Sequence, residues 1–458
     1  MEETVEHARD LGRRLGEEVG LSIFLYENAA TREDRRNLAQ VRAGEYEALR
    51  ERLADPSHSP DFGPATFQER TGATAVGARD FLIAYNVNLN TTSTRRANAI
   101  AFDVREKGRI RREPDPLTGE IVRDSAGEPV WTPGSLRCVK GIGWFIEEYG
   151  IAQISMNLTD LAVTPLHVAF DECCEKARDR GIRVTGSEVV GLVPLEAMLE
   201  AGRHFLRKQR RSTGISDTEL IKIAVRSMGL DELTPFDPRE KIIEYAIADR
   251  ERRRLVDLTL LGFTEETASE SPAPGGGSIA AAAGALGAAL GTMVANLSSH
   301  KRGWDERWEE FSTWAERGKA AQSELLALVD RDTEAFDALM AAWRADPSER
   351  GAAIQAATLQ AMEIPTRVME VSLEALAVCA AMAESGMSAS ASDAGVGAMC
   401  ARLAVRGAAL NVRINAPGLD DEDRRASLLA RAEELVLRAE KEEQAVLKRV
   451  DQRLAEEA

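Results

Sequence analysis

Residues 271–278 read Ser-Pro-Ala-Pro-Gly-Gly-Gly-Ser, and they lead into a run from residue 279 to 297 that carries no charge and is mostly alanine and glycine. The prolines end any preceding element, the glycines leave backbone N–H groups uncovered, and Ser278 is a favourable N-cap for a helix. A helix that starts in this way offers a natural site for an anion. A purely structural buried helix is the alternative, and these residues alone do not separate the two.

The run after residue 278 also predicts how its helix packs. Gly284, Gly287 and Gly291 are spaced three and four apart, so they share one helix face and let another helix approach closely. The run is long enough to cross a bilayer, but alanine and glycine make it only weakly hydrophobic, so we expect no membrane contact. Helical periodicity continues almost to residue 458, with breaks at 301–303, 346–348, 384–386 and 417–418. The second half is therefore predicted to be an all-α, up-and-down helix bundle.

The composition limits the class of protein. With 458 residues the chain exceeds a single core and should form two or three domains. Its net charge of −17 disfavours non-specific binding to nucleic acid. The five cysteines form no C-x-x-C pair, and the five histidines show no metal-ligand spacing. We therefore expect reduced thiols, no metal and, because the acidic N-terminus is not a secretory signal, a cytoplasmic protein.

The first half alternates helices and strands. Leu11, Leu15 and Val19 predict an apolar stripe on the first helix, which precedes a short buried strand at 21–26. From residue 81 the pattern predicts the β-α-β-β-α-β order of a ferredoxin-like, α+β fold. The predicted ranges are a strand at 81–90, a helix at 93–106, strands at 139–146 and 151–158, a helix at 164–180 and a strand at 183–187. Residues 109–136, with Pro114 and Pro116, read as a hairpin-like insertion without assigned chemistry.

Six stretches carry a resemblance to one known family. They are Arg-Ala-Gly-Glu-Tyr-Glu at 42–47, Asp-Phe-Gly-Pro at 61–64, Gly-Ala-Arg at 77–79, Gly-Ile-Gly-Trp at 141–144, Gly-Leu-Val-Pro at 191–194, and residues 271–278 with their alanine-rich helix. In this order they resemble formimidoyltransferase-cyclodeaminase over nearly the whole chain. The resemblance implies a transferase N-terminal subdomain at 1–80, a transferase C-terminal subdomain at 81–250 and a cyclodeaminase domain at 251–458. The charged run at 250–254 is the expected linker.

The resemblance also implies an activity. The enzyme would move a formimidoyl group from N-formimidoyl-L-glutamate to tetrahydrofolate, then convert 5-formimidoyltetrahydrofolate to 5,10-methenyltetrahydrofolate and ammonia, in histidine degradation. Its carrier would be tetrahydrofolate, with or without a polyglutamate tail, and its assembly a homo-oligomer in which the glycine-faced helix suits a subunit interface.

In the family, the stretch after residues 61–64 lines the folate site. The resemblance therefore assigns folate contact to a set of ten residues, whereas the residues alone favour a tight surface loop. The ten are Gly63, Pro64, Ala65, Thr66, Phe67, Gln68, Glu69, Arg70, Thr71 and Gly72.

One acid stands out in the second half. Asp332 falls on an apolar stripe with Leu328, Val329 and Ala335, whereas Asp330 falls on the polar face. A carboxylate on such a stripe is costly unless it is paired, and burial raises its pKa toward the range that is useful for proton transfer. An Asp satisfied by a neighbouring Arg or backbone N–H is the alternative. The resemblance favours catalysis, because Asp332 matches the catalytic aspartate of the family's cyclodeaminase.

We group five further residues as a cyclodeaminase pocket: Gly275, Gly276, Gly277, Ser278 and Asn411. Asn411 and Asn415 lie four apart on one predicted helix, where their amides could contact a pterin edge or bond between helices.

A histidine segment of the family is missing from this sequence. The family's transferase uses a histidine in an H-P-R-[I/M]-G-A stretch, and none of the five histidines here precedes Pro-Arg. We therefore assign no transferase base and expect most of the N-terminal transferase subdomain to be absent. The alternative function is a cyclodeaminase alone, whose first half is a non-catalytic module for folate binding and assembly.

Overall fold

The computed structural model describes residues 1–115, 118–248, 254–271 and 273–457. The expected linker at 250–254 lies almost entirely outside the described residues, and so do Pro116 and Pro272. By its internal contacts the chain divides into two compact units, residues 1–191 and residues 192–458.

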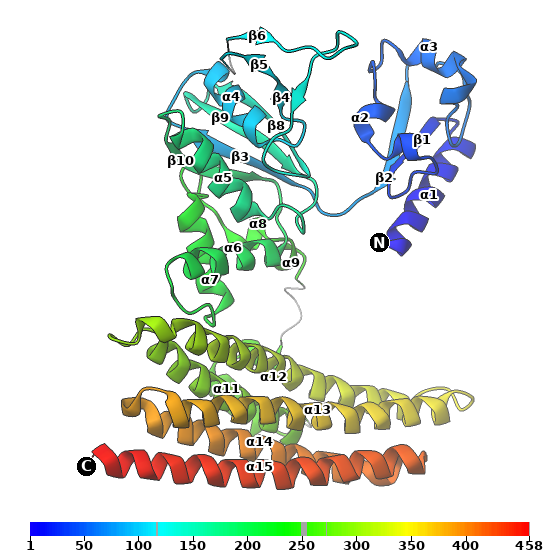
Figure 1. Cartoon of the computed structure of the whole chain (residues 1–458). Helices are drawn as coiled ribbons and strands as arrows, with labels where there is room; N and C mark the ends of the chain where they lie inside the picture. Colours follow the sequence, from blue (N-terminus) through cyan, green and yellow to red (C-terminus); the bar gives the residue numbers. More distant parts are fainter. Residues whose placement is uncertain (116–117, 249–253, 272, 458) are drawn as a thin grey trace. The chain divides into compact units, whose positions relative to one another are not determined.

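The N-terminal part of the first unit places one helix against two parallel strands (Figure 1). The packing face of α1 consists of Ala8, Gly12 and Gly16, and a Cβ on Gly12 would meet Leu25 and Ile23 of β1 at 3.1 and 3.3 Å. The predicted apolar stripe was wrong, because Leu11 and Val19 are exposed. Small residues replace it because the helix lies too close to the strands for larger side chains. The elements are α1 (Glu2–Glu17), β1 (Ser22–Glu27), η1 (Glu33–Arg35), α2 (Leu38–Val41), α3 (Leu49–Ala54), η2 (Pro56–His58) and β2 (Ala73–Ala78).

Residues 83–190 form the predicted ferredoxin-like fold. The antiparallel sheet has the order β10-β3-β9-β8, and α4 and α5 cover one of its faces (Figure 1). Every second residue of β3, including Tyr85 and Val87, is fully buried, as expected for side chains that point under the helices. The elements are β3 (Ile83–Leu89), α4 (Thr94–Val104), β8 (Val139–Ile146), β9 (Ile151–Leu158), α5 (Leu166–Arg178) and β10 (Val184–Val190).

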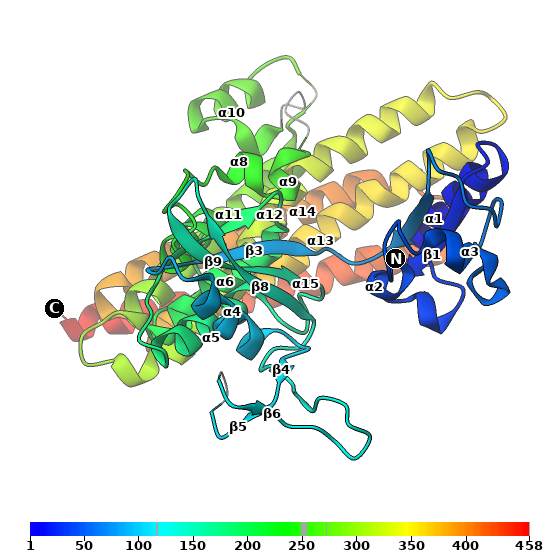
Figure 2. The same ribbon diagram turned by 90° about the horizontal axis from the view of Figure 1, so that it is seen from above.

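The predicted insertion between α4 and β8 forms two short antiparallel pairs. β4 pairs with β7 and β5 with β6, and Figure 2 shows the segment extending away from the sheet. The strands are β4 (Arg109–Ile110), β5 (Arg112–Glu113), β6 (Glu120–Ile121) and β7 (Trp131–Thr132).

Every regular element in the described residues of the second unit is a helix, and its five long helices form the predicted bundle (Figure 1). The four predicted breaks fall between those helices. The long helices are α11 (Gly276–Ser299), α12 (Trp308–Trp343), α13 (Arg350–Ser385), α14 (Ala391–Asn415) and α15 (Glu422–Glu457). The shorter elements are α6 (Leu195–Lys208), α7 (Asp217–Met228), α8 (Pro238–Lys241), α9 (Ile243–Ala246), η3 (Leu255–Asp257), α10 (Leu260–Thr267), η4 (Asp305–Arg307), η5 (Ser388–Ser390) and η6 (Ala416–Gly418).

The glycine face of α11 lies inside the bundle. A Cβ on Gly287 would sit 2.6 Å from the carbonyl oxygen of Gly397 on α14, and one on Gly291 would sit 3.0 Å from Val378 on α13. The close helix approach is therefore confirmed, but the glycines serve contacts within this chain and not the expected subunit interface. α11 is the one helix among the described residues that is long and apolar enough to cross a membrane, and most of it is buried in the bundle.

The loop after α6 ties the preceding helices to the bundle. Asn296 of α11 accepts a hydrogen bond from the Ser212 hydroxyl at 2.6 Å and donates one to the carbonyl of Gly214 at 2.8 Å. The backbone N–H of Thr213 donates to Ser312 of α12 at 3.1 Å. These bonds explain why residues 192–248 belong to the same compact unit as the bundle.

Candidate active site

Asp332 of α12 faces the first turn of α11. Its Oδ2 lies 3.1 Å from the hydroxyl of Ser278, which also lies 2.9 Å from the carbonyl oxygen of Val329. Ser278 is fully buried and is the third residue of the helix, so the expectation that it is the N-cap was wrong. Gly275 takes that position, with an extended backbone and no side chain to donate or accept. The Ser278 hydroxyl is thereby free to turn toward α12.

Gly277 allows the carboxylate to come this close. A Cβ at this position would lie 2.5 Å from both Cγ and Oδ2 of Asp332, well inside ordinary van der Waals contact. Only a residue without a side chain leaves room for the acid against the helix backbone. The glycines at the start of α11 thus have a steric role that their sequence pattern did not reveal.

The first turn of α11 presents backbone donors that have no acceptor within the helix. The first α-helical hydrogen bond runs from the N–H of Ile279 to the carbonyl of Gly275 at 3.1 Å, so the amides of Gly276, Gly277 and Ser278 have no partner within the helix. These donors and the helix dipole favour a negative charge at this point. Asp332 supplies one such charge, and a bound anion or a developing charge could meet the remaining donors.

Two opposing effects act on the pKa of Asp332. Burial raises the pKa of this carboxyl above its ordinary value, and the hydroxyl and backbone amide of Ser278 oppose that rise by hydrogen bonding to the charged form. Burial is the larger effect. The side chain is therefore closer to exchanging protons near neutral pH than an ordinary surface aspartate.

Asn411 of α14 approaches the same place. A Cβ on Gly276 would lie 3.6 Å from its Nδ2, while that nitrogen donates to the carbonyl of Gly407 in its own helix. Asn415, one turn on, donates to the carbonyl of Ala361 on α13 at 3.0 Å and so bonds between helices. The structure therefore brings Asp332, residues 275–278 and Asn411 together, and Asn415 has a packing role.

Sequence reasoning missed Thr333 and expected Asp330 to be more exposed than it is. Thr333 lies 3.3 Å from the Ser278 hydroxyl. Asp330, expected on the polar face, is half-buried and accepts a hydrogen bond from the backbone N–H of Leu255 at 2.7 Å; burial raises the pKa of its carboxyl. Periodicity along α12 could not show that residues 255–257 would cover that face.

The segment at 63–72 divides into two parts. Its first part is anchored to the start of β1 and the turn before it: the carbonyl of Pro64 accepts from Ser22 at 2.6 Å, and Gln68 donates to the carbonyl of Gly20 at 2.9 Å. Its last three residues line a cavity of about 370 Å³ together with aromatic and basic side chains. The lining includes Phe24, Arg42, Tyr46, Arg52, Arg70, Thr71 and Gly72. Only Arg70, Thr71 and Gly72 of the ten predicted folate-contacting residues border this cavity.

The histidines show no arrangement for a shared function. His167 is buried on α5, and His58 lies at the surface with its Nδ1 3.2 Å from Asp55. Across the described ranges, no cluster of three or more His, Cys, Asp or Glu side chains could hold a metal ion.

The chain contains a ferredoxin-like α+β part with an N-terminal segment that forms a cavity. It also contains a helix bundle with a half-buried acid at the start of a helix. Together these features define a multidomain enzyme with two candidate sites. Comparison with known families supports this class. Models described as the formiminotransferase domain and its N-terminal subdomain match residues 84–248 and 1–79. A model described as formiminotransferase-cyclodeaminase matches residues 259–434.

Individual relatives agree over most of the chain. The formimidoyltransferase-cyclodeaminase of Gallus gallus is 41% identical over 429 residues, which are 92% of this chain and 75% of that protein. The Sus scrofa enzyme of the same name is 37% identical over 468 residues, 99% of this chain and 82% of that protein. A glutamate formimidoyltransferase of Thermoplasma acidophilum is 38% identical over 209 residues, 45% of this chain and 60% of that protein.

The chain belongs to the formimidoyltransferase-cyclodeaminase family. The expectation that most of the N-terminal transferase subdomain is absent was wrong, because residues 1–79 match that subdomain and fold as a helix on two parallel strands. The error came from treating one missing motif as the loss of the part that contains it.

Proposed function

We propose that this chain moves a formimidoyl group from N-formimidoyl-L-glutamate to tetrahydrofolate and then releases ammonia from 5-formimidoyltetrahydrofolate, giving 5,10-methenyltetrahydrofolate in histidine degradation. The family models for both parts, on one chain, support the two activities. They do not favour the alternative of a cyclodeaminase with a non-catalytic first half, since both transferase models match.

In the second step, N10 of the folate attacks the formimidoyl carbon on N5. The formimidoyl group enters protonated, with its nitrogen as =NH2⁺. A bond from N10 to the formimidoyl carbon forms, the bond from that carbon to the former imine nitrogen breaks, and the proton lost from N10 must reach this nitrogen so that it leaves as ammonia. We assign this transfer to Asp332, whose carboxylate would accept the N10 proton and return it to the leaving amine. A carboxyl whose pKa is raised by burial suits both directions of transfer.

The observation that carries this assignment is the position of Asp332 at the open start of α11. The amides of Gly276 and Gly277 lie beside it and could bind the substrate, while Asn411 could contact the pterin edge. For the first step, Arg70, Thr71 and Gly72 are proposed to contact folate from the cavity of about 370 Å³.

Assaying the two steps separately on the full chain tests the proposal. Formimidoyl transfer is measured with N-formimidoyl-L-glutamate and tetrahydrofolate, and ammonia release with supplied 5-formimidoyltetrahydrofolate. Both activities are expected. Ammonia release without transfer would favour the alternative function, and loss of both would refute the proposal.

We further propose that the chain is a homo-oligomer through the outer face of α11 and α14. Leu286 and Met293 of α11, and Leu403, Leu410 and Ile414 of α14, are exposed at helical spacing, with Ile414 77% exposed. Light scattering should give a mass above that of one chain, and Leu410→Glu should lower it. Leu437→Glu, which changes an exposed leucine on α15, is the control. A single-chain mass for the unaltered protein would contradict the proposal.

A further inference from the structure

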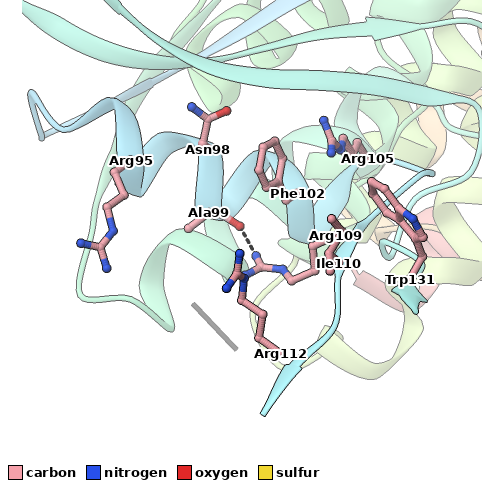
Figure 3. A pocket seen from close by; sticks show the side chains of 9 residues that line it. All are labelled: Arg95, Asn98, Ala99, Phe102, Arg105, Arg109, Ile110, Arg112 and Trp131. Carbon is pink, nitrogen blue, oxygen red and sulfur yellow. Dashed lines mark hydrogen bonds between the residues drawn. The ribbon is translucent and has the colours of Figure 1, made fainter. Parts of the chain in front are cut away.

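The insertion between α4 and β8 borders a basic cavity that shares no lining residue with the two candidate sites described above. The cavity has a volume of about 430 Å³, within the range of small-molecule sites, and lies between the outer side of α4 and the first strands of the insertion. Figure 3 shows Arg95 near the start of α4, Phe102 farther along it, and Arg105, Arg109, Arg112 and Trp131 toward and beyond its end. No acidic side chain borders it among the described residues.

The positive charge in this cavity is largely unbalanced. Arg109 pairs with Asp103, but that carboxylate also pairs with Arg180 outside the cavity. Arg105 donates only to backbone carbonyls, those of Gly108 and Gly141.

Arg112 likewise donates to a carbonyl, that of Gly119. In the part of the chain that the structure describes, no carboxylate lies within ion-pair distance of Arg95, Arg105 or Arg112. Among the described residues, three guanidinium groups at this cavity thus lack a counter-charge.

One of these guanidinium groups, that of Arg105, is also held in place. The Cζ of Arg105 lies 3.9 Å from the centroid of the Phe102 ring, which fixes the plane of the guanidinium. Burial and the neighbouring charge of Arg109 both lower the pKa of Arg105, so the protein itself disfavours the crowding of positive charge here. An anion in the cavity would relieve that repulsion.

We propose that this cavity is a binding site for a small polyanion, a ligand with two or more carboxylate or phosphate groups. Guanidinium groups bind both kinds of group through paired N–H donors. Several such groups around one cavity favour a multivalent ligand over chloride. Trp131 adds an aromatic wall, 41% exposed, with Lys107 over its ring at 4.4 Å.

Citrate and pyrophosphate, each titrated into the full chain by calorimetry at fixed salt, test the proposal and distinguish a carboxylate ligand from a phosphate ligand. Binding of either supports it and names the acidic group. Arg95→Ala and Arg112→Ala should each weaken binding by about tenfold or more, because each removes a charge-assisted contact. Arg96→Ala is the matched control. Arg96 is the next residue on α4, is also exposed and does not border the cavity, so the affinity of this variant should stay within about twofold of the unaltered chain.

Two results would overturn the proposal. One is the absence of binding by both probes at about 0.1 M salt, where charges in a cavity are only partly screened. The other is equal weakening by Arg95→Ala and Arg96→Ala, which would show a general charge effect. A thermal unfolding scan of each variant without ligand shows whether a loss of binding reflects unfolding. Arg95 is exposed, so its replacement should leave the unfolding temperature unchanged.

Discussion

Replacing Gly277 by alanine keeps the carboxylate of Asp332 but moves it, so this variant tests whether the position of the carboxylate matters. The added Cβ would lie 2.5 Å from Cγ and Oδ2 of Asp332, whereas ordinary contact begins at 3.4 Å. The carboxylate must therefore retreat by about 1 Å. It lies at the end of a side chain and can turn away, so the helices need not move.

The expected loss follows from that displacement. A misplacement of about 1 Å in a catalytic group costs on the order of 100-fold in rate. Ammonia release from supplied 5-formimidoyltetrahydrofolate should fall by about this factor, while formimidoyl transfer by the same preparation stays unchanged. Alanine is also a better helix former than glycine, by up to about 1 kcal/mol, so the fold should not weaken through propensity.

Gly351→Ala provides the control. Gly351 is likewise the second residue of a long bundle helix, α13, but a Cβ there would meet nothing within 4 Å. Its ammonia release should match that of the unaltered chain. If Gly277→Ala released ammonia as fast as Gly351→Ala, the carboxylate would not need its present position and the reasoning would fail.

Three further outcomes follow from the same contacts. Ser278→Ala removes a hydrogen bond that lowers the pKa of Asp332, so the acidic limb of the pH–rate profile for ammonia release should move to higher pH; an unchanged limb would contradict this. Folding raises the pKa of Asp332, so ionisation of this carboxyl destabilises the native state as the pH rises from about 4 through the folded pKa. Asp332→Asn should therefore unfold at a higher temperature than the unaltered chain at pH 8. This difference should disappear toward pH 4. Gly287→Ala would press on the Gly397 carbonyl at 2.6 Å and should cost about 1–3 kcal/mol in urea unfolding, whereas Gly395→Ala, whose nearest contact is 3.5 Å, should not.

The sequence predicted the parts of the fold that depend on local patterns. The four breaks between the bundle helices fall at glycine or proline, which end helices through their own backbone limits. The strand and helix order of residues 83–190 followed from alternating and helical periodicity, and the structure confirms it.

What the sequence could not predict depends on tertiary contacts. Ser278 was predicted to be an N-cap, but its hydroxyl turns toward α12 because Oδ2 of Asp332 lies there at 3.1 Å. Leu11 and Val19 looked like a core stripe, but α1 packs through glycine and alanine instead. The arginine cavity joins α4 to an insertion that was predicted only as hairpin-like. Its position against α4 depends on tertiary contacts, so the four guanidinium groups could not be placed together in advance.

The most direct test of proton transfer by Asp332 is ammonia release by the Asp332→Asn variant. The variant is supplied with 5-formimidoyltetrahydrofolate, and its ammonia release is compared with formimidoyl transfer by the same protein. Loss of a general acid–base group costs about 10²–10⁴-fold, so release should fall by that range while transfer continues and 5-formimidoyltetrahydrofolate accumulates. A folded Asp332→Asn variant that released ammonia at the full rate would contradict the role of this carboxylate as the proton carrier.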